Sequence, residues 1–122
     1  MHAQIAPVAL KVLVLEDEAL ILLDIETTLA NAHYEVRTAA TGREALALLD
    51  AHAFDAAVID VGLQTGNSLA VADALLKRAI PFVFSSGTND PIPVEFANVP
   101  LISKPFADQE LLALVGSVLA PR

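Results

Sequence analysis

The feature that most constrains the fold is a regular alternation of short strand-like segments with longer helical ones. Strands are predicted at Lys11–Leu15, Tyr34–Thr38, Phe54–Ile59, Phe82–Ser85 and Val99–Ile102. The first of them, KVLVL, is a continuous apolar run, which is typical of a parallel strand buried on both faces. Helices are predicted at Glu18–Ala30, Arg43–His52, Ser68–Ala79 and Asp108–Leu119. Strand–helix alternation repeated about five times predicts an α/β fold, a doubly wound parallel sheet with helices on both faces.

The stretch between the fourth and fifth predicted strands breaks this regularity. Val94–Asn98 has room for no more than one helical turn, and three prolines surround it, at Pro91, Pro93 and Pro100. We therefore expect a five-stranded sheet with a short or missing fourth helix. No repeat or linker divides the chain, so residues 11–119 are predicted to form one domain, preceded by a flexible lead-in of residues 1–10.

Composition excludes several classes of function. The 7 basic and 15 acidic residues give a net charge of −8, which repels phosphates and argues against binding to nucleic acid. No apolar run reaches the roughly 18 residues needed to cross a membrane, and the N-terminus lacks the pattern of a signal peptide. The chain has no cysteine, so it has neither disulfides nor thiolate sites. We expect a cytoplasmic protein without a membrane partner.

Chemistry-bearing residues follow four of the five predicted strands. In an open parallel sheet, ligands bind outside the carboxyl ends of the strands, so side chains that follow the strands should meet there. The residues at these positions are Glu16, Asp17, Asp60, Ser85, Ser86, Gly87, Ser103 and Lys104. We therefore expect three carboxylates, a hydroxyl and an amine to converge on one edge of the sheet.

Three neighbouring carboxylates repel one another, and a hard divalent cation removes that conflict. Oxygen ligands with open water positions suit Mg²⁺. A metal beside Asp60 would neutralise charge on an incoming phosphoryl oxygen, while Lys104 and Ser86 could cover two others. Ser85 competes with Ser86 for this contact, but strand alternation points them to opposite sides, and the spacing from Pro81 favours Ser86. Asp60 would become an acyl phosphate.

Four motifs resemble the receiver domain of bacterial two-component response regulators. They are VLVLEDE at Val12–Glu18, AAVID at Ala56–Asp60, PFVFSSG at Pro81–Gly87 and SKPF at Ser103–Phe106. The resemblance covers Lys11–Leu119 and implies the flavodoxin-like (β/α)5 fold and a Mg²⁺ cofactor. It implies that Asp60 is the phosphoacceptor and that Ser86 and Lys104 contact the phosphoryl group. It also implies a cis peptide before Pro105. The implied metal ligands are the side chains of Glu16, Asp17 and Asp60 and the carbonyl of Gly62.

The sequence departs from the family in the parts that pass on the signal. Receivers usually carry an aromatic switch residue three positions before the lysine, where this chain has Leu101. The segment from Ser86 to Lys104 is short, and PFVFSSGT resembles atypical receivers whose fourth strand ends in a Phe-Ala-Thr-Gly-like motif. The phosphorylation chemistry is expected to be intact, whereas coupling through a rotating ring cannot operate at Leu101.

Three functions follow as hypotheses. In the first, a histidine kinase or phosphotransfer protein phosphorylates Asp60, and a downstream protein, or a second copy in a homodimer, reads the changed surface without an attached output domain. The domain would not be an enzyme beyond self-phosphorylation and slow self-dephosphorylation. In the second, a degenerate receiver docks to its partner independently of phosphorylation. In the third, the same edge binds a nucleotide or flavin, although the acidic Glu16–Glu18 opposes a phosphate there.

Overall fold

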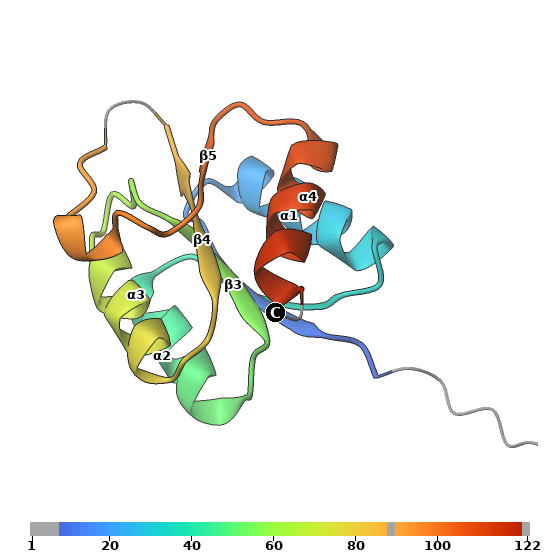
Figure 1. Ribbon diagram of the computed structural model, residues 1–122, viewed down its shortest axis with the longest axis horizontal. Coiled ribbons are helices and arrows are strands. Elements are labelled where there is room, and N and C mark those ends of the chain that lie inside the picture. The colour runs from blue at the N-terminus through green and yellow to red at the C-terminus, as the bar shows by residue number, and fades with distance from the viewer. Residues whose placement is uncertain (1–7, 88–89, 121–122) are drawn as a thin grey trace, which may run out of the picture.

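The protein is built around a single parallel sheet. The computed structural model describes residues 8–87 and 90–120. The strands are β1 (Lys11–Leu15), β2 (Glu35–Ala39), β3 (Ala56–Asp60), β4 (Phe82–Ser86) and β5 (Leu101–Ser103). They lie in the order β2-β1-β3-β4-β5, and every neighbouring pair is parallel. The sheet is therefore the predicted one, with β3 at its centre (Figure 1).

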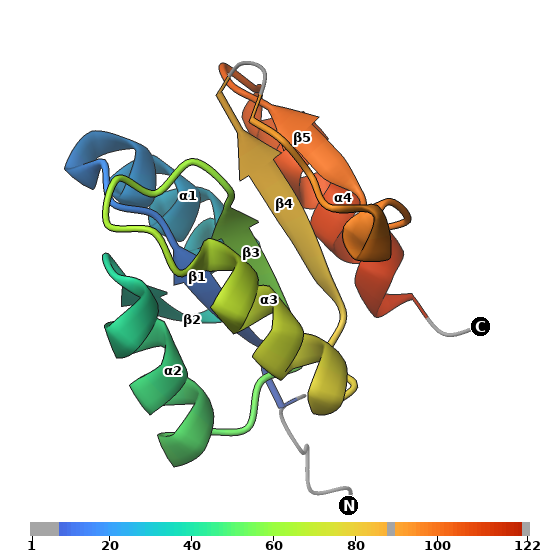
Figure 2. The same ribbon diagram turned by 90° about the vertical axis from the view of Figure 1, so that its left-hand side faces the viewer.

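Helices cover both faces of the sheet. They are α1 (Ala19–Asn31), α2 (Gly42–Ala51), α3 (Ser68–Lys77) and α4 (Asp108–Leu119). Figure 1 shows α1 and α4 on one face and α2 and α3 on the other, and Figure 2 shows the second face. The predicted doubly wound, flavodoxin-like α/β fold is confirmed.

Two hydrophobic cores explain why the central strands are mostly apolar. Side chains that alternate along a strand point to opposite faces, so each strand contributes to both cores. Val14, Val58 and Val83 pack under α1 and α4, whereas their neighbours Leu15, Ile59 and Phe84 pack under α2 and α3. β3 and β4 are buried along their whole length.

The helix that the alternation would place between β4 and β5 is reduced to one short turn. Among the described residues between β4 and β5, which exclude 88 and 89, the chain forms only the 3-10 turn η1 (Val94–Phe96), which confirms the prediction of a short or missing helix. β5 begins at Leu101 rather than at the predicted Val99. The reason is local, because the Val99 N–H donates to the carbonyl of Phe96 at 3.0 Å and so closes the turn.

The two ends of the sheet have different roles. At the amino end, the Asp55 carboxylate accepts a hydrogen bond from the Lys11 N–H at 2.8 Å. At the carboxyl end, β1, β3, β4 and β5 all run into the loops that carry the chemistry-bearing residues. Of the predicted lead-in, residues 1–7 lie outside the described residues, and residues 8–10 precede β1 without regular structure. Within residues 8–87 and 90–120, no helix has the length and apolar character needed to cross a membrane.

Candidate functional site

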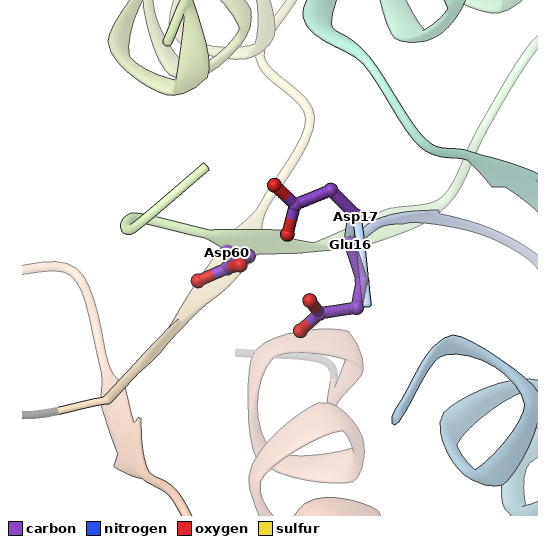
Figure 3. Close-up of side chains that lie close together, drawn as sticks. All are labelled: Glu16, Asp17 and Asp60. Carbon is purple, nitrogen blue, oxygen red and sulfur yellow. The ribbon is translucent and has the colours of Figure 1, made fainter. Parts of the chain in front are cut away.

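Three carboxylates meet at the carboxyl ends of β1 and β3. Glu16 and Asp17 directly follow β1, and Asp60 is the last residue of β3, the strand beside it. Each offers one oxygen, and these three oxygens all lie within 4.8 Å of one another. Figure 3 shows the three side chains gathered at this point. Glu16 and Asp60 are buried, whereas Asp17 is partly exposed, so solvent and ions reach the cluster from the side of Asp17.

Lys104 brings an ammonium group to this acidic cluster from the end of the edge strand β5. It follows β5, and its side chain reaches past β4 so that Nζ lies 2.7 Å from Glu16 Oε1 and 3.4 Å from Asp60 Oδ2. Its backbone N–H donates to the Ser86 carbonyl at 2.8 Å, which fixes the loop after β5 against β4. The peptide bond between Lys104 and Pro105 is cis, as the resemblance implies.

Burial and charge determine the protonation of Glu16 and Lys104. Burial raises the pKa of Glu16, although hydrogen bonds from Lys104 and from the Glu18 N–H work in the opposite direction. Burial on its own would lower the pKa of Lys104, but the hydrogen bond to Glu16 and the negative charges of Asp60 and Glu16 outweigh it and raise that pKa. Lys104 is therefore firmly charged at neutral pH, which suits a group that must attract anionic oxygens.

Backbone amides hold each carboxylate in place. The three hydrogen bonds run from Glu18 N–H to Glu16 Oε2 at 3.0 Å, from Gly62 N–H to Asp60 Oδ1 at 3.0 Å, and from Gln64 N–H to Asp17 Oδ2 at 2.9 Å. The loop after β3 is thus tied both to Asp60 and to the loop after β1. Since the ligand atoms are oriented before anything binds, little ordering is required when a ligand arrives.

Comparison with known proteins agrees with this geometry. Residues 12–116, nearly the whole sheet and its helices, match the family model "Response regulator receiver domain". This chain belongs to the response regulator receiver domain family. Receiver domains act in two-component signalling, so the chain is a signalling domain and not an enzyme in the usual sense.

Two curated relatives align with most of this chain. The chain is 32% identical over 114 residues to "Probable transcriptional regulator ycf27" of Cyanophora paradoxa, covering 89% of this chain and 48% of that protein. It is 31% identical over 116 residues to "Transcriptional regulatory protein PdtaR" of Mycobacterium tuberculosis, covering 90% of this chain and 57% of that protein. The chain thus spans about half the length of the curated relatives it matches.

Solved receiver structures superimpose on it over most of its length. SdrG of Sphingomonas melonis Fr1 is 34% identical with a TM-score of 0.79, over 92% of this chain and 98% of SdrG. The chemotaxis protein CheY4 of Vibrio cholerae is 28% identical with a TM-score of 0.79, over 92% of this chain and 100% of CheY4. The similarity extends across the receiver fold as a whole.

The acidic cluster of this receiver domain fits a magnesium ion. Its donor atoms are all carboxylate oxygens, the ligands that Mg²⁺ prefers, and Asp17 leaves an open side for water. The roles of Asp17 and Asp60 as direct ligands of the ion stay predictions. Glu16, the third predicted carboxylate ligand, is in contact with Lys104. The Gly62 carbonyl as a further ligand stays a prediction.

The two serines at the end of β4 have different surroundings. Ser85 pairs in register with Asp60 and is buried, and its hydroxyl has no hydrogen-bond partner within residues 8–87 and 90–120. Ser86 is the last residue of the strand, and its hydroxyl donates to Asp90 at 2.9 Å. The assignment of the phosphate contact to Ser86 stays a prediction. Sequence reasoning missed Asp90, for which the only signal was an acidic residue four positions after Ser86.

Leu101, at the aromatic switch position of other receivers, is the first residue of β5 and half-exposed. An aliphatic side chain there has no ring to rotate between an inner and an outer position. A different element must therefore respond to the state of Asp60 if the domain signals through phosphorylation.

The structure predicts that Lys104→Met destabilises the metal-free domain by about 3 kcal/mol at neutral pH. The reason is that the substitution leaves buried carboxylates without their cation. The loss should shrink at acidic pH, because the folded state binds the Glu16 proton more tightly than the unfolded chain does. Urea unfolding at two pH values measures both effects.

Lys77→Met is the matched control for this substitution. Lys77 pairs with Asp73 one helical turn away, with both side chains mostly exposed. Losing such a surface pair should change the free energy of unfolding by less than about 0.5 kcal/mol at either pH. Equal losses for the two variants would show that Lys104 is not compensating buried charge.

Proposed function

We propose that this domain receives a phosphoryl group on Asp60 from a phosphohistidine of a histidine kinase or phosphotransfer protein, in a Mg²⁺-dependent reaction. The observation that carries the proposal is the meeting of Asp60 with Asp17, Glu16 and Lys104 at one sheet edge. Such a group of charges is what phosphoryl transfer requires, because that reaction depends on positioning and electrostatic stabilisation. A cytoplasmic location belongs to the same proposal.

The transfer itself uses Asp60 as the nucleophile. A carboxylate oxygen attacks phosphorus in line with the bond to the donor imidazole, the new O–P bond forms, and the electron pair of the broken N–P bond returns to the ring. The Gly62 N–H binds Oδ1 and the Lys104 ammonium lies 3.4 Å from Oδ2, so both oxygens are oriented for this attack. A bound Mg²⁺ would supply positive charge that stabilises the phosphoryl oxygens.

Lys104 and Ser86 would complete the surroundings of the phosphoryl group. The Lys104 ammonium can move from Glu16 to a phosphoryl oxygen without leaving the cluster, since it already lies between Glu16 and Asp60. The Ser86 hydroxyl would donate to a second oxygen. The phosphorylated surface would then be recognised by a downstream protein or by a second copy of the domain.

A second candidate function is docking that does not depend on phosphorylation. Leu101 in place of an aromatic residue and η1 in place of a helix favour it, because both depart from the elements through which receivers respond. The assignment to the Phe-Ala-Thr-Gly-like receivers also stays a prediction.

Phosphoryl uptake from acetyl phosphate separates the two functions. After incubation with Mg²⁺ and acetyl phosphate, intact mass spectrometry of the wild-type domain should show the addition of one phosphoryl group. Asp55→Asn, at the opposite end of β3, should gain the same mass, because its carboxylate caps the Lys11 N–H away from the site. A wild-type protein that gains nothing, and binds no beryllofluoride, would favour docking.

A further inference from the structure

The hydroxyl that should contact the phosphoryl group is already bound to another anion. Ser86 Oγ donates to Asp90 Oδ2 at 2.9 Å, and the Gly87 N–H donates to the same oxygen at 3.3 Å. Ser86 is only 6% exposed, so its hydroxyl has little access to water as an alternative partner. Both donors at the end of β4 thus converge on one carboxylate oxygen.

The Asp90 carboxylate also lies against the loop that carries the phosphoacceptor. A Cβ atom at Gly62 would stand 3.0 Å from Asp90 Oδ2 and 3.4 Å from Oδ1. A side chain at this position would press on the carboxylate, which would then have to shift by a few tenths of an ångström. The N–H of that same glycine donates to Asp60 Oδ1. Asp90 therefore lies against the loop that holds Asp60, although the two acids are far apart in sequence.

A phosphoryl group on Asp60 and the Asp90 carboxylate would compete for the same donor. A serine hydroxyl carries one proton and can donate one hydrogen bond at a time. A phosphoryl group also adds negative charge beside a carboxylate, at a site that already holds Glu16, Asp17 and Asp60. Both effects favour the departure of Asp90 once Asp60 is modified.

We propose that Asp90 is an internal competitor of the phosphoryl group: it holds Ser86 in the unphosphorylated state and is displaced on phosphorylation. This inference rests on the proposed phosphorylation of Asp60 and adds its regulation. Asp90 is a positioning residue, because it acts through Ser86 and does not touch the transferred group.

The displacement gives the domain an output that does not need an aromatic switch. Asp90 leads into η1, where Phe96 is 4% exposed and packs edge-on against Phe84 at 5.8 Å between ring centres. Phe96 therefore anchors one end of the segment, and the Asp90 contact holds the other. Release of Asp90 frees the stretch between them, which carries Val94 at 85% exposure on the surface.

The rate of phosphoryl uptake from acetyl phosphate with Mg²⁺ tests the competition. Asp90→Ala should take up the phosphoryl group about tenfold faster than wild type at limiting acetyl phosphate, because Ser86 no longer has to leave a charged partner. Asp90→Asn keeps an acceptor for Ser86 without the charge and should lie between the two. Glu95→Gln is the matched control, an exposed acid of the same segment whose loss should leave the rate unchanged.

The same measurement in a Ser86→Ala background separates competition from a general effect of charge. Without the hydroxyl, the donor for which the two anions compete is gone and only the longer Gly87 N–H contact remains, so Asp90→Ala should then accelerate uptake by less than about twofold. An equal acceleration with and without Ser86, or none in the first background, would overturn the competition while leaving the proposed function standing. A wild-type domain that takes up no phosphoryl group would instead overturn the proposed function itself.

Discussion

Asp60→Asn is expected to abolish phosphoryl uptake from acetyl phosphate completely. The side-chain amide of asparagine is a poor nucleophile and cannot form an acyl phosphate. The other two acids of the cluster do not replace Asp60, because each is bound to another group. Glu16 is bound by Lys104, and Asp17 accepts the Gln64 N–H. Intact mass spectrometry after incubation with Mg²⁺ and acetyl phosphate measures the effect. An Asp60→Asn protein that still gains one phosphoryl group would place the acceptor elsewhere.

The fold of this variant provides its own control. Removing the Asp60 charge relieves its repulsion with Glu16, which acts to raise the pKa of that buried acid. We therefore expect Asp60→Asn to unfold at a urea concentration close to that of the wild-type domain. A large loss of stability would mean that missing uptake reflects misfolding rather than a missing nucleophile.

Asp17→Asn is expected to slow phosphoryl uptake by about two orders of magnitude and to remove its dependence on Mg²⁺. Asparagine still accepts the Gln64 N–H through its oxygen, so the loop after β3 should keep its position. What disappears is the charge on the carboxylate that faces the open side of the cluster. The measurement is the uptake rate across a Mg²⁺ titration.

Asp24→Asn supplies the matched control for Asp17→Asn. Asp24 is an exposed acid on α1 and lies outside the group of carboxylates that could hold the ion. Its loss changes the net charge equally and should leave the Mg²⁺ titration unchanged. If Asp17→Asn retained the wild-type titration, the metal would be bound by other residues.

The fold was predictable because the central strands are buried on both faces. In β1, β3 and β4 most side chains pack into one of the two cores, so the sequence there is mostly apolar. β5 was harder to place. It has three residues and one buried side chain, Ile102, and the hydrogen bond from Val99 to Phe96 that delays its start has no local sequence signature.

The acidic cluster was predictable for a topological reason. Parallel strands bring the residues that follow them to one edge, so the meeting of Glu16, Asp17 and Asp60 needs only the strand order and not the loop conformations. Lys104 could be placed near them by the same reasoning. Its preference for Glu16 over Asp60, 2.7 Å against 3.4 Å, depends on the side-chain path across β4 and was not foreseen.

The contact between Asp90 and Ser86 was beyond sequence reasoning. It depends on how the chain turns after β4, and no hydrophobic period constrains that turn. Strand alternation favoured Ser86 over Ser85, yet it gave no indication that the Ser86 hydroxyl would already have an anionic partner. The resemblance to other receivers did not supply this contact either, because it assigned roles only to positions that match the family motifs.

Chemical trapping of the modified residue tests the central claim most directly. Borohydride reduces an acyl phosphate to an alcohol and releases phosphate, whereas it leaves serine phosphate esters unchanged. After treatment with Mg²⁺ and acetyl phosphate, then borohydride, peptide mass spectrometry should find Asp60 converted to homoserine, and no other acid altered. A phosphoryl group that survives borohydride, or a reduced residue at any other position, would contradict the assignment of Asp60 as the acceptor.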